Sequence, residues 1–69
     1  MTFGEKIKEL RLAKKLTLKE VAEQAGLSIV SVNLYETGKV NPELTNLHKL
    51  AKGLGCKFEE LYEVWKNQN

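Results

Sequence analysis

Residues 17–37 contain two helix-start signals, at Thr17 and Ser28, with a helix-stop signal at Gly26 between them. This spacing limits how two consecutive helices can meet. Thr17 and Glu20 have the spacing of a capping box, in which each side chain accepts a hydrogen bond from the other residue's main chain. Gly26 suits the left-handed conformation that ends a helix. Ser28 is an N-cap candidate only two residues later. Ala22 is small enough to let the following helix approach closely. The pattern therefore predicts a helix-turn-helix over about residues 17–37.

Three further helices are predicted around this pair. Thr2 and Glu5 form another capping-box spacing, which predicts a first helix that ends near Ala13. Asn41-Pro42 reads as the start of a fourth helix, because proline suits the first helical position. Gly55 is expected to end that helix.

A fifth amphipathic helix is predicted over about residues 57–66, where apolar residues recur at helical spacing. The alternating pattern of a β-strand is nearly absent. The 69 residues suffice for one domain only. The expected fold is therefore all-α, a compact five-helix domain over residues 1–69.

Composition argues against several classes of function. A chain of 69 residues is too short for most enzyme folds, and it shows no Ser/His/Asp arrangement or phosphate-cradling glycine loop. With one histidine, His48, and one cysteine, Cys56, it offers no set of metal ligands at the expected spacing. We therefore expect no enzymatic activity, no metal and no cofactor. Cys56 is expected to be a small buried apolar side chain.

The charge balance is mildly basic, and no segment resembles a signal peptide or a membrane span. Lys and Arg number 11 against 9 Asp and Glu, a net charge of +2. All of this excess falls in residues 1–35, so a polyanion-binding face is expected toward the N-terminal half. No apolar run approaches the roughly 18 residues that a membrane span needs. The protein is expected to be intracellular.

The chain resembles the Cro/CI-type helix-turn-helix family of prokaryotic and phage transcription regulators, also called the XRE family. The resemblance covers about residues 3–62. Its most specific part is the block Tyr35-Glu36-Thr37-Gly38-Lys39 followed by Asn41-Pro42; other matching blocks are residues 7–11, 16–22, 26–28 and 47–55. It implies a lambda-repressor-like fold and a cytoplasmic, sequence-specific regulator, a repressor that binds double-stranded DNA.

The resemblance also implies roles for individual residues. Arg11 and Glu36 match an internal ion pair that ties the first helix to the end of the third. Tyr35 matches a core aromatic that can also lean toward the DNA backbone. The positions that read bases in relatives are occupied by Ile29, Val30 and Leu34, with Asn33 beside them. Positions suited to contact the DNA backbone are Thr17, Leu18, Ser28, Ser31, Tyr35, Thr37, Lys39 and Asn41.

The apolar base-reading positions depart from the family pattern, because relatives often place Gln, Ser, Arg or Asn there. No Arg or Gln is available at these positions for a bidentate contact to guanine or adenine. Three interpretations stay open. Ile29, Val30 and Leu34 can pack on thymine methyl groups while DNA shape adds specificity. They can instead form a protein-docking surface, as in an antitoxin-like partner-binding protein. Or Leu18 and Ile29 simply cover each other.

The last predicted helix is more apolar than the end of a chain requires. Because the family often pairs through its fourth and fifth helices, we expect a two-fold homodimer on a roughly palindromic operator. The expected interface residues are Leu61, Tyr62, Val64 and Trp65. Two recognition helices would then lie about 34 Å apart. The alternative is that Trp65 covers the core of its own chain.

Overall fold

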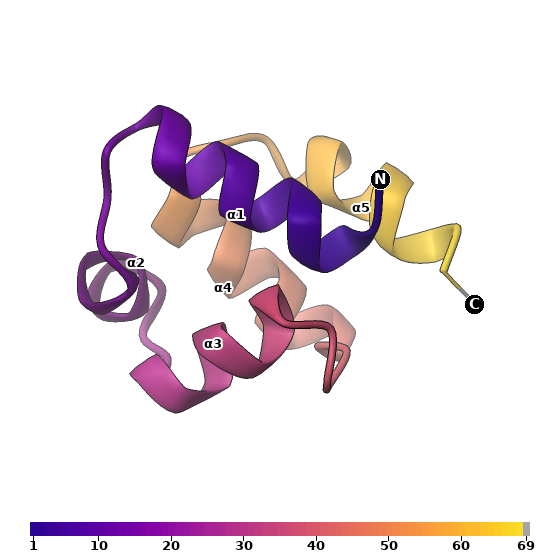
Figure 1. Cartoon of the computed structure of the whole chain (residues 1–69). Helices are drawn as coiled ribbons and strands as arrows, with labels where there is room; N and C mark the ends of the chain where they lie inside the picture. The colour runs from indigo at the N-terminus through magenta and orange to yellow at the C-terminus, as the bar shows by residue number, and fades with distance from the viewer. Residues whose placement is uncertain (69) are drawn as a thin grey trace.

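The structure is a computed structural model that describes residues 1–68. It confirms the five-helix, all-α prediction (Figure 1). The helices are α1 (Phe3–Ala13), α2 (Leu18–Ala25), α3 (Ile29–Glu36), α4 (Leu44–Leu54) and α5 (Phe58–Lys66). They pack into a body of 28 × 20 × 19 Å. Within residues 1–68 no helix is long and apolar enough to cross a membrane.

Side-chain caps begin the first three helices, as the sequence predicted. The Thr2 hydroxyl accepts from the main-chain N–H of Glu5 at 3.1 Å, and the Glu5 carboxylate accepts from Thr2 N–H at 2.9 Å. This second bond lowers the pKa of the Glu5 carboxyl. Thr17 and Glu20 repeat the arrangement at 3.0 and 2.8 Å. Ser28 accepts from Ser31 N–H at 3.0 Å and begins α3.

Left-handed residues end α2 and α4, again as predicted. Gly26 has φ 73° and Gly55 has φ 66°. The end of α1 was not predicted in this form. Lys15 adopts φ 58°, and the N–H of Leu16 bonds to the carbonyl of Arg11 at 3.1 Å. A lysine therefore fills the position that glycine usually occupies after a helix.

The predicted start of α4 at Asn41-Pro42 is wrong, because α4 begins at Leu44 with Glu43 as its N-cap residue. Pro42 is buried just outside the helix. Its carbonyl accepts the Trp65 indole N–H at 2.8 Å. A tertiary contact with α5 thus accompanies the placement of Pro42, which the local proline rule could not include.

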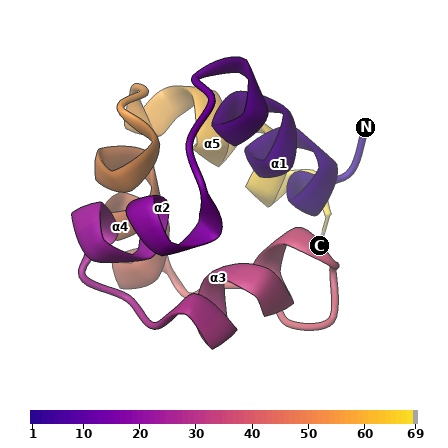
Figure 2. The same ribbon diagram turned by 60° about the vertical axis from the view of Figure 1, so that its left-hand side comes forward.

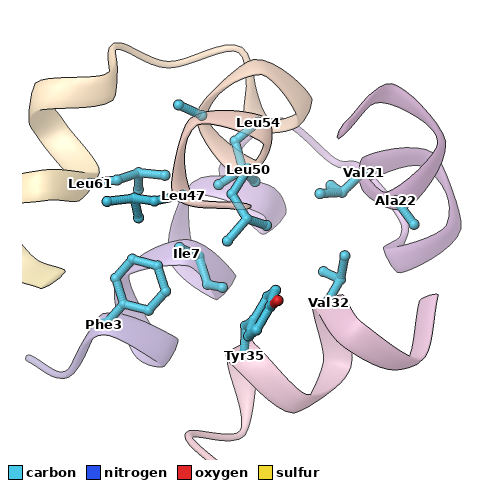
Figure 3. Packing of buried hydrophobic residues seen from close by; sticks show 11 residues of the cluster. Phe3, Ile7, Val21, Ala22, Val32, Tyr35, Leu47, Leu50, Leu54 and Leu61 are labelled. Atoms are coloured by element: carbon cyan, nitrogen blue, oxygen red, sulfur yellow. The ribbon is translucent and has the colours of Figure 1, made fainter. Parts of the chain in front are cut away.

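All five helices contribute to one core (Figure 3). Its largest fully buried side chains are Phe3, Ile7, Val21, Val32, Leu47, Leu50, Leu54 and Leu61. Cys56 is only partly buried and packs against this core, where desolvation raises the pKa of its thiol.

Two glycines inside helices allow neighbouring backbones to approach closely. A Cβ on Gly53 of α4 would lie 2.7 Å from the Val21 carbonyl oxygen and 2.7 Å from the Ala25 Cβ, both on α2. A Cβ on Gly4 of α1 would lie 2.8 Å from the Tyr35 carbonyl oxygen of α3. Through these contacts α4 fixes α2, and α1 fixes the C-terminal end of α3.

Candidate nucleic-acid interface

The helices α2 and α3 form the predicted helix-turn-helix. Residues 26–28 join them, and the main-chain N–H of Leu27 bonds back to the Ala22 carbonyl at 2.9 Å. Val32 on the inner side of α3 is completely buried and points toward Val21 and Ala22 of α2 (Figure 3). The motif is therefore held by apolar packing as well as by the turn.

The helix α3 lies along one edge of the molecule, and α5 lies toward the opposite edge (Figure 2). The outer side chains of α3 are open to solvent. Ile29 is 46% exposed, Val30 is 67% exposed, and Asn33 is also exposed. Leu34 is only partly exposed, as is Leu18 at the start of α2, which packs against the core. Of the four predicted base-reading side chains, Ile29, Val30 and Asn33 present the most open surface.

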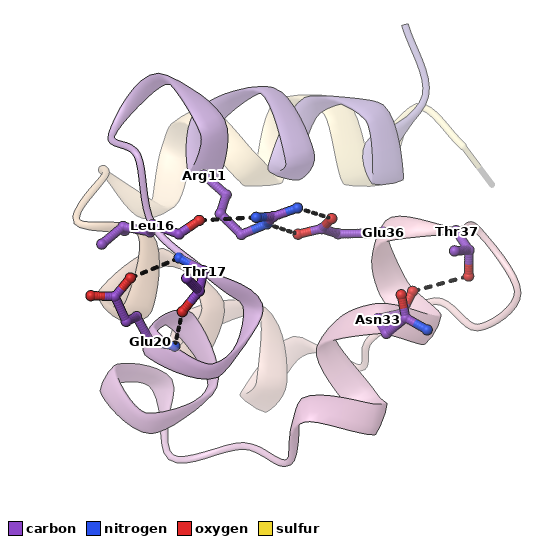
Figure 4. Close-up of polar contacts among 7 residues, drawn as sticks. All are labelled: Arg11, Leu16, Thr17, Glu20, Asn33, Glu36 and Thr37. Carbon is purple, nitrogen blue, oxygen red and sulfur yellow. Dashed lines mark hydrogen bonds and ion pairs between the residues drawn. The ribbon is translucent and has the colours of Figure 1, made fainter.

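An ion pair fixes the C-terminal end of α3 (Figure 4). Arg11 Nε donates to Glu36 Oε2 at 2.7 Å, and Arg11 Nη2 donates to Glu36 Oε1 at 3.1 Å. A third guanidinium bond reaches the Leu16 carbonyl at 2.9 Å. The hydrogen bonds to the Glu36 carboxylate raise the pKa of Arg11. The ion pair implied by the family resemblance is therefore confirmed, and it joins α1, the following loop and α3.

The predicted backbone-contacting hydroxyls differ in what they can still offer. Thr37 donates its proton to the carbonyl of Asn33 at 3.0 Å (Figure 4). Ser28 donates to Ser31 Oγ at 2.9 Å while it caps α3. Since a hydroxyl has one proton, those of Thr37 and Ser28 are occupied. Thr17 accepts a bond in its capping box and retains its proton for another acceptor.

The segment after α3 presents an exposed lysine beside a positioned amide. Gly38 has φ 76°, and the N–H of Lys39 bonds back to the Leu34 carbonyl at 3.1 Å. Asn41 accepts a bond from the Gln68 amide at 3.4 Å through its Oδ1. Its own NH₂ group therefore remains the donor that Asn41 can present outward. Gln68 also accepts from Phe3 N–H at 3.1 Å, a long-range link that no local sequence pattern predicts.

Tyr35 is a core residue, which confirms one of its two predicted roles. It is 6% exposed, and its hydroxyl accepts a hydrogen bond from Asn46 Nδ2 at 2.9 Å. Asn46 belongs to α4, and no local pattern pointed to it. The pair links α3 to α4 next to the helix-turn-helix.

The predicted interface residues of α5 lie in different environments. Leu61 is wholly buried in its own chain's core and does not belong in a dimer interface, because its side chain has no exposed surface. Val64 and Trp65 are partly buried against the core. Tyr62 is 36% exposed.

A row of aromatic rings connects α4 with α5, which the sequence did not predict. His48 stacks on Phe58 with ring centroids 3.8 Å apart, and Phe58 lies 5.5 Å from the Tyr62 ring. Tyr62 lies 5.9 Å from Trp65. His48 is thus an exposed histidine held by ring stacking. Among residues 1–68 no group of three His, Cys, Asp or Glu side chains is placed to hold a metal ion.

Comparison with known proteins agrees with this geometry. A family model described as helix-turn-helix matches residues 7–61. This chain belongs to the XRE-type helix-turn-helix family. This chain is 39% identical over 61 residues to the control protein C.MunI of Mycoplasma sp, and the match covers 87% of this chain and 82% of that protein. It is 40% identical over 61 residues to the immunity repressor of Bacillus phage phi105, covering 88% of this chain and 42% of that protein.

A solved structure shares the fold of this family member. The restriction-modification controller protein C.AhdI of Aeromonas hydrophila superposes with a TM-score of 0.82 at 39% identity, covering 86% of this chain and 89% of that chain. Other curated relatives are longer proteins. The chain spans 30% of the length of a transcriptional activator and 43% and 49% of the lengths of two further regulators. These relatives favour a regulator over the protein-docking alternative.

Proposed function

We propose that this chain binds double-stranded DNA by inserting the outer side of α3 into the major groove, and that it thereby regulates transcription as a repressor. The observation that carries the proposal is the exposed face of Ile29, Val30 and Asn33 on a helix whose other side is fixed. The major groove admits one α-helix, and the second helix of a helix-turn-helix is the one that enters it. The matched relatives named as regulators support this reading. The proposed activity is binding alone, without a catalytic step.

Contacts to the DNA backbone would come from groups on both sides of α3. Lys39 supplies an exposed ammonium group, Asn41 its NH₂ group and Thr17 a hydroxyl proton. We also assign backbone contacts to the main-chain amides at the start of α2, because a helix N-terminus attracts phosphate. Thr37 and Ser28 would act by positioning the main chain, since their hydroxyl protons are occupied.

The first test is selection of bound sequences from a random duplex library, followed by titration of the selected duplex at several salt concentrations. Lys39→Ala should weaken binding to all duplexes and reduce the log–log salt slope by about 0.9. Lys57→Ala is the matched control, because Lys57 is an exposed lysine just before α5 and should change neither quantity. Failure of the wild-type chain to retain any duplex would contradict the proposal.

We further propose that the chain acts as a two-fold homodimer through the row of rings on α4 and α5. Leu44, 48% exposed, lies one helical turn before His48 on α4 and adds an exposed apolar side chain, and Tyr62 adds an exposed ring. In this proposal the partly buried side chains of Val64 and Trp65 pack against the core beneath this face. The helix α5, which carries Tyr62, lies toward the opposite edge of the molecule from α3, so a dimer formed there would leave both recognition helices free to bind DNA (Figure 1).

Sedimentation equilibrium tests the dimer. Tyr62→Glu should shift the chain toward monomer, because the variant places a charge in an apolar contact. It should also weaken binding to a two-half-site duplex more than binding to a single half-site. Leu12→Glu is the control, since Leu12 is an exposed apolar side chain on α1. A wild-type chain that remains monomeric while bound to a palindromic duplex would overturn this assembly.

A further inference from the structure

The most exposed side chains at the start of α3 are apolar, although the helix already buries an apolar inner side. Ile29 is 46% exposed and Val30 is 67% exposed, whereas Val32 is completely buried. The exposed pair occupies the first helical turn, which is the part of a recognition helix that meets base edges. The surface offered to the bases is therefore mainly methyl and methylene groups.

Polar readout by the rest of α3 is restricted by contacts within the chain. The Ser28 proton goes to Ser31 Oγ, and the Glu36 carboxylate accepts two bonds from Arg11. The helix sequence from 29 to 36 contains no Arg, Lys or Gln. Asn33 is the exposed amide on this helix, so one side chain can make a bidentate contact to adenine.

We propose that α3 selects DNA by the C5-methyl groups of pyrimidines, so that it binds thymine and 5-methylcytosine alike at the positions facing Ile29 and Val30. This inference rests on the proposed function and specifies its ligand chemistry. The C5 position of pyrimidines lies in the major groove, where thymine carries an apolar methyl group and cytosine a hydrogen. Burying one methyl group against an apolar side chain corresponds to about a fourfold gain in affinity. Cytosine methylation at such a position would therefore raise the affinity of that DNA site about fourfold.

The test replaces thymines one at a time with deoxyuridine in the duplex found by selection. Deoxyuridine keeps the base-pairing edge and the O4 acceptor and removes only the methyl group. We expect a loss of about fourfold in affinity at one or two thymines of each half-site and little change at the others. Where such a thymine is replaced by cytosine, 5-methylcytosine should bind about fourfold more tightly than cytosine.

Protein variants show whether the effect comes from Ile29 and Val30. In the Ile29→Ala and Val30→Ala chains, we compare the affinity for the thymine duplex with the affinity for the deoxyuridine duplex. The ratio of the two should fall toward one at the base that the substituted side chain faces. Asn33→Ala is the control, because it should weaken binding while leaving that ratio near fourfold. Thermal unfolding, monitored by circular dichroism, verifies that each variant is folded.

The outcomes separate this inference from the proposed function. Sequence-specific binding with equal affinity for thymine and deoxyuridine would overturn methyl readout and leave DNA recognition intact. A deoxyuridine effect that persists in both alanine variants would also overturn it, since the methyl group would then act through DNA shape. Absence of binding to any duplex would overturn both.

Discussion

The inner and outer sides of α3 carry similar apolar residues but have different surroundings. On the inner side, Val32 and Tyr35 are buried against α2 and α4, and Glu36 is bonded to Arg11 of α1. On the outer side, Ile29 and Val30 face solvent. Side-chain polarity alone therefore does not identify the core face of this helix. The positions of α1, α2 and α4 decide which apolar residues are covered.

The neighbouring helix α2 shows the usual arrangement. Its apolar residues Val21, Ala22 and Ala25 are buried, and Glu23 and Gln24 are exposed. Leu18 at the start of α2 is only partly exposed, so the outer side of α2 offers less apolar surface than Ile29 and Val30 give to α3. The contrast indicates that the exposed side chains of α3 are available for a partner, and DNA is the partner we propose.

The largest expected effect comes from breaking the contact that holds α3 to α1. Arg11→Ala should lower the free energy of unfolding by about 3 kcal/mol, because it leaves the Glu36 carboxylate unpaired in a site where its side chain is 6% exposed. Urea denaturation measures this change. Lys66→Ala is the control, since the Lys66–Glu63 pair is exposed and should contribute at most about 1 kcal/mol. Equal effects of the two substitutions would mean that the Arg11–Glu36 pair behaves like a surface pair.

The next comparison applies one change to both sides of α3. Val32→Ala should cost about 2 kcal/mol of stability, because it removes two fully buried methyl groups and leaves a cavity. Val30→Ala should change stability by no more than about 0.5 kcal/mol, since Val30 is 67% exposed. Thermal melting of the two variants gives the difference directly. Similar losses for both would show that Val30 is covered within the chain and is not free to contact DNA.

The parts of this fold that could be predicted from the sequence depend on local contacts. Thr2, Thr17 and Ser28 cap residues three positions away, so their spacing was sufficient to place three helix starts. Gly26 and Gly55 were predictable for the same reason, because a left-handed residue is a local requirement. The pairing of Arg11 with Glu36 is not local, and it was available only through resemblance to a family.

The parts that were missed depend on residues distant in the sequence. The carbonyl of Pro42 bonds to Trp65, and α4 starts two residues later than its proline suggested. Gly4 and Gly53 permit close helix contacts that no spacing rule describes. Leu61 was predicted to lie in a dimer interface, because an apolar residue at helical spacing can be buried either by its own chain or by a partner. Helical periodicity predicts that a residue is covered, and the tertiary structure determines what covers it.

The smallest expected effect concerns the single polar atom that Tyr35 places beside α4. Tyr35→Phe should lower stability by about 1 kcal/mol, because the Asn46 amide loses the hydroxyl that accepts its hydrogen bond at 2.9 Å. Since Asn46 is only partly buried, water can replace part of that contact. Tyr62→Phe is the control on an exposed ring and should leave stability nearly unchanged. If Tyr35→Phe preserved stability but weakened binding to every duplex, the hydroxyl would serve the DNA backbone, and the inner side of α3 would also take part in recognition.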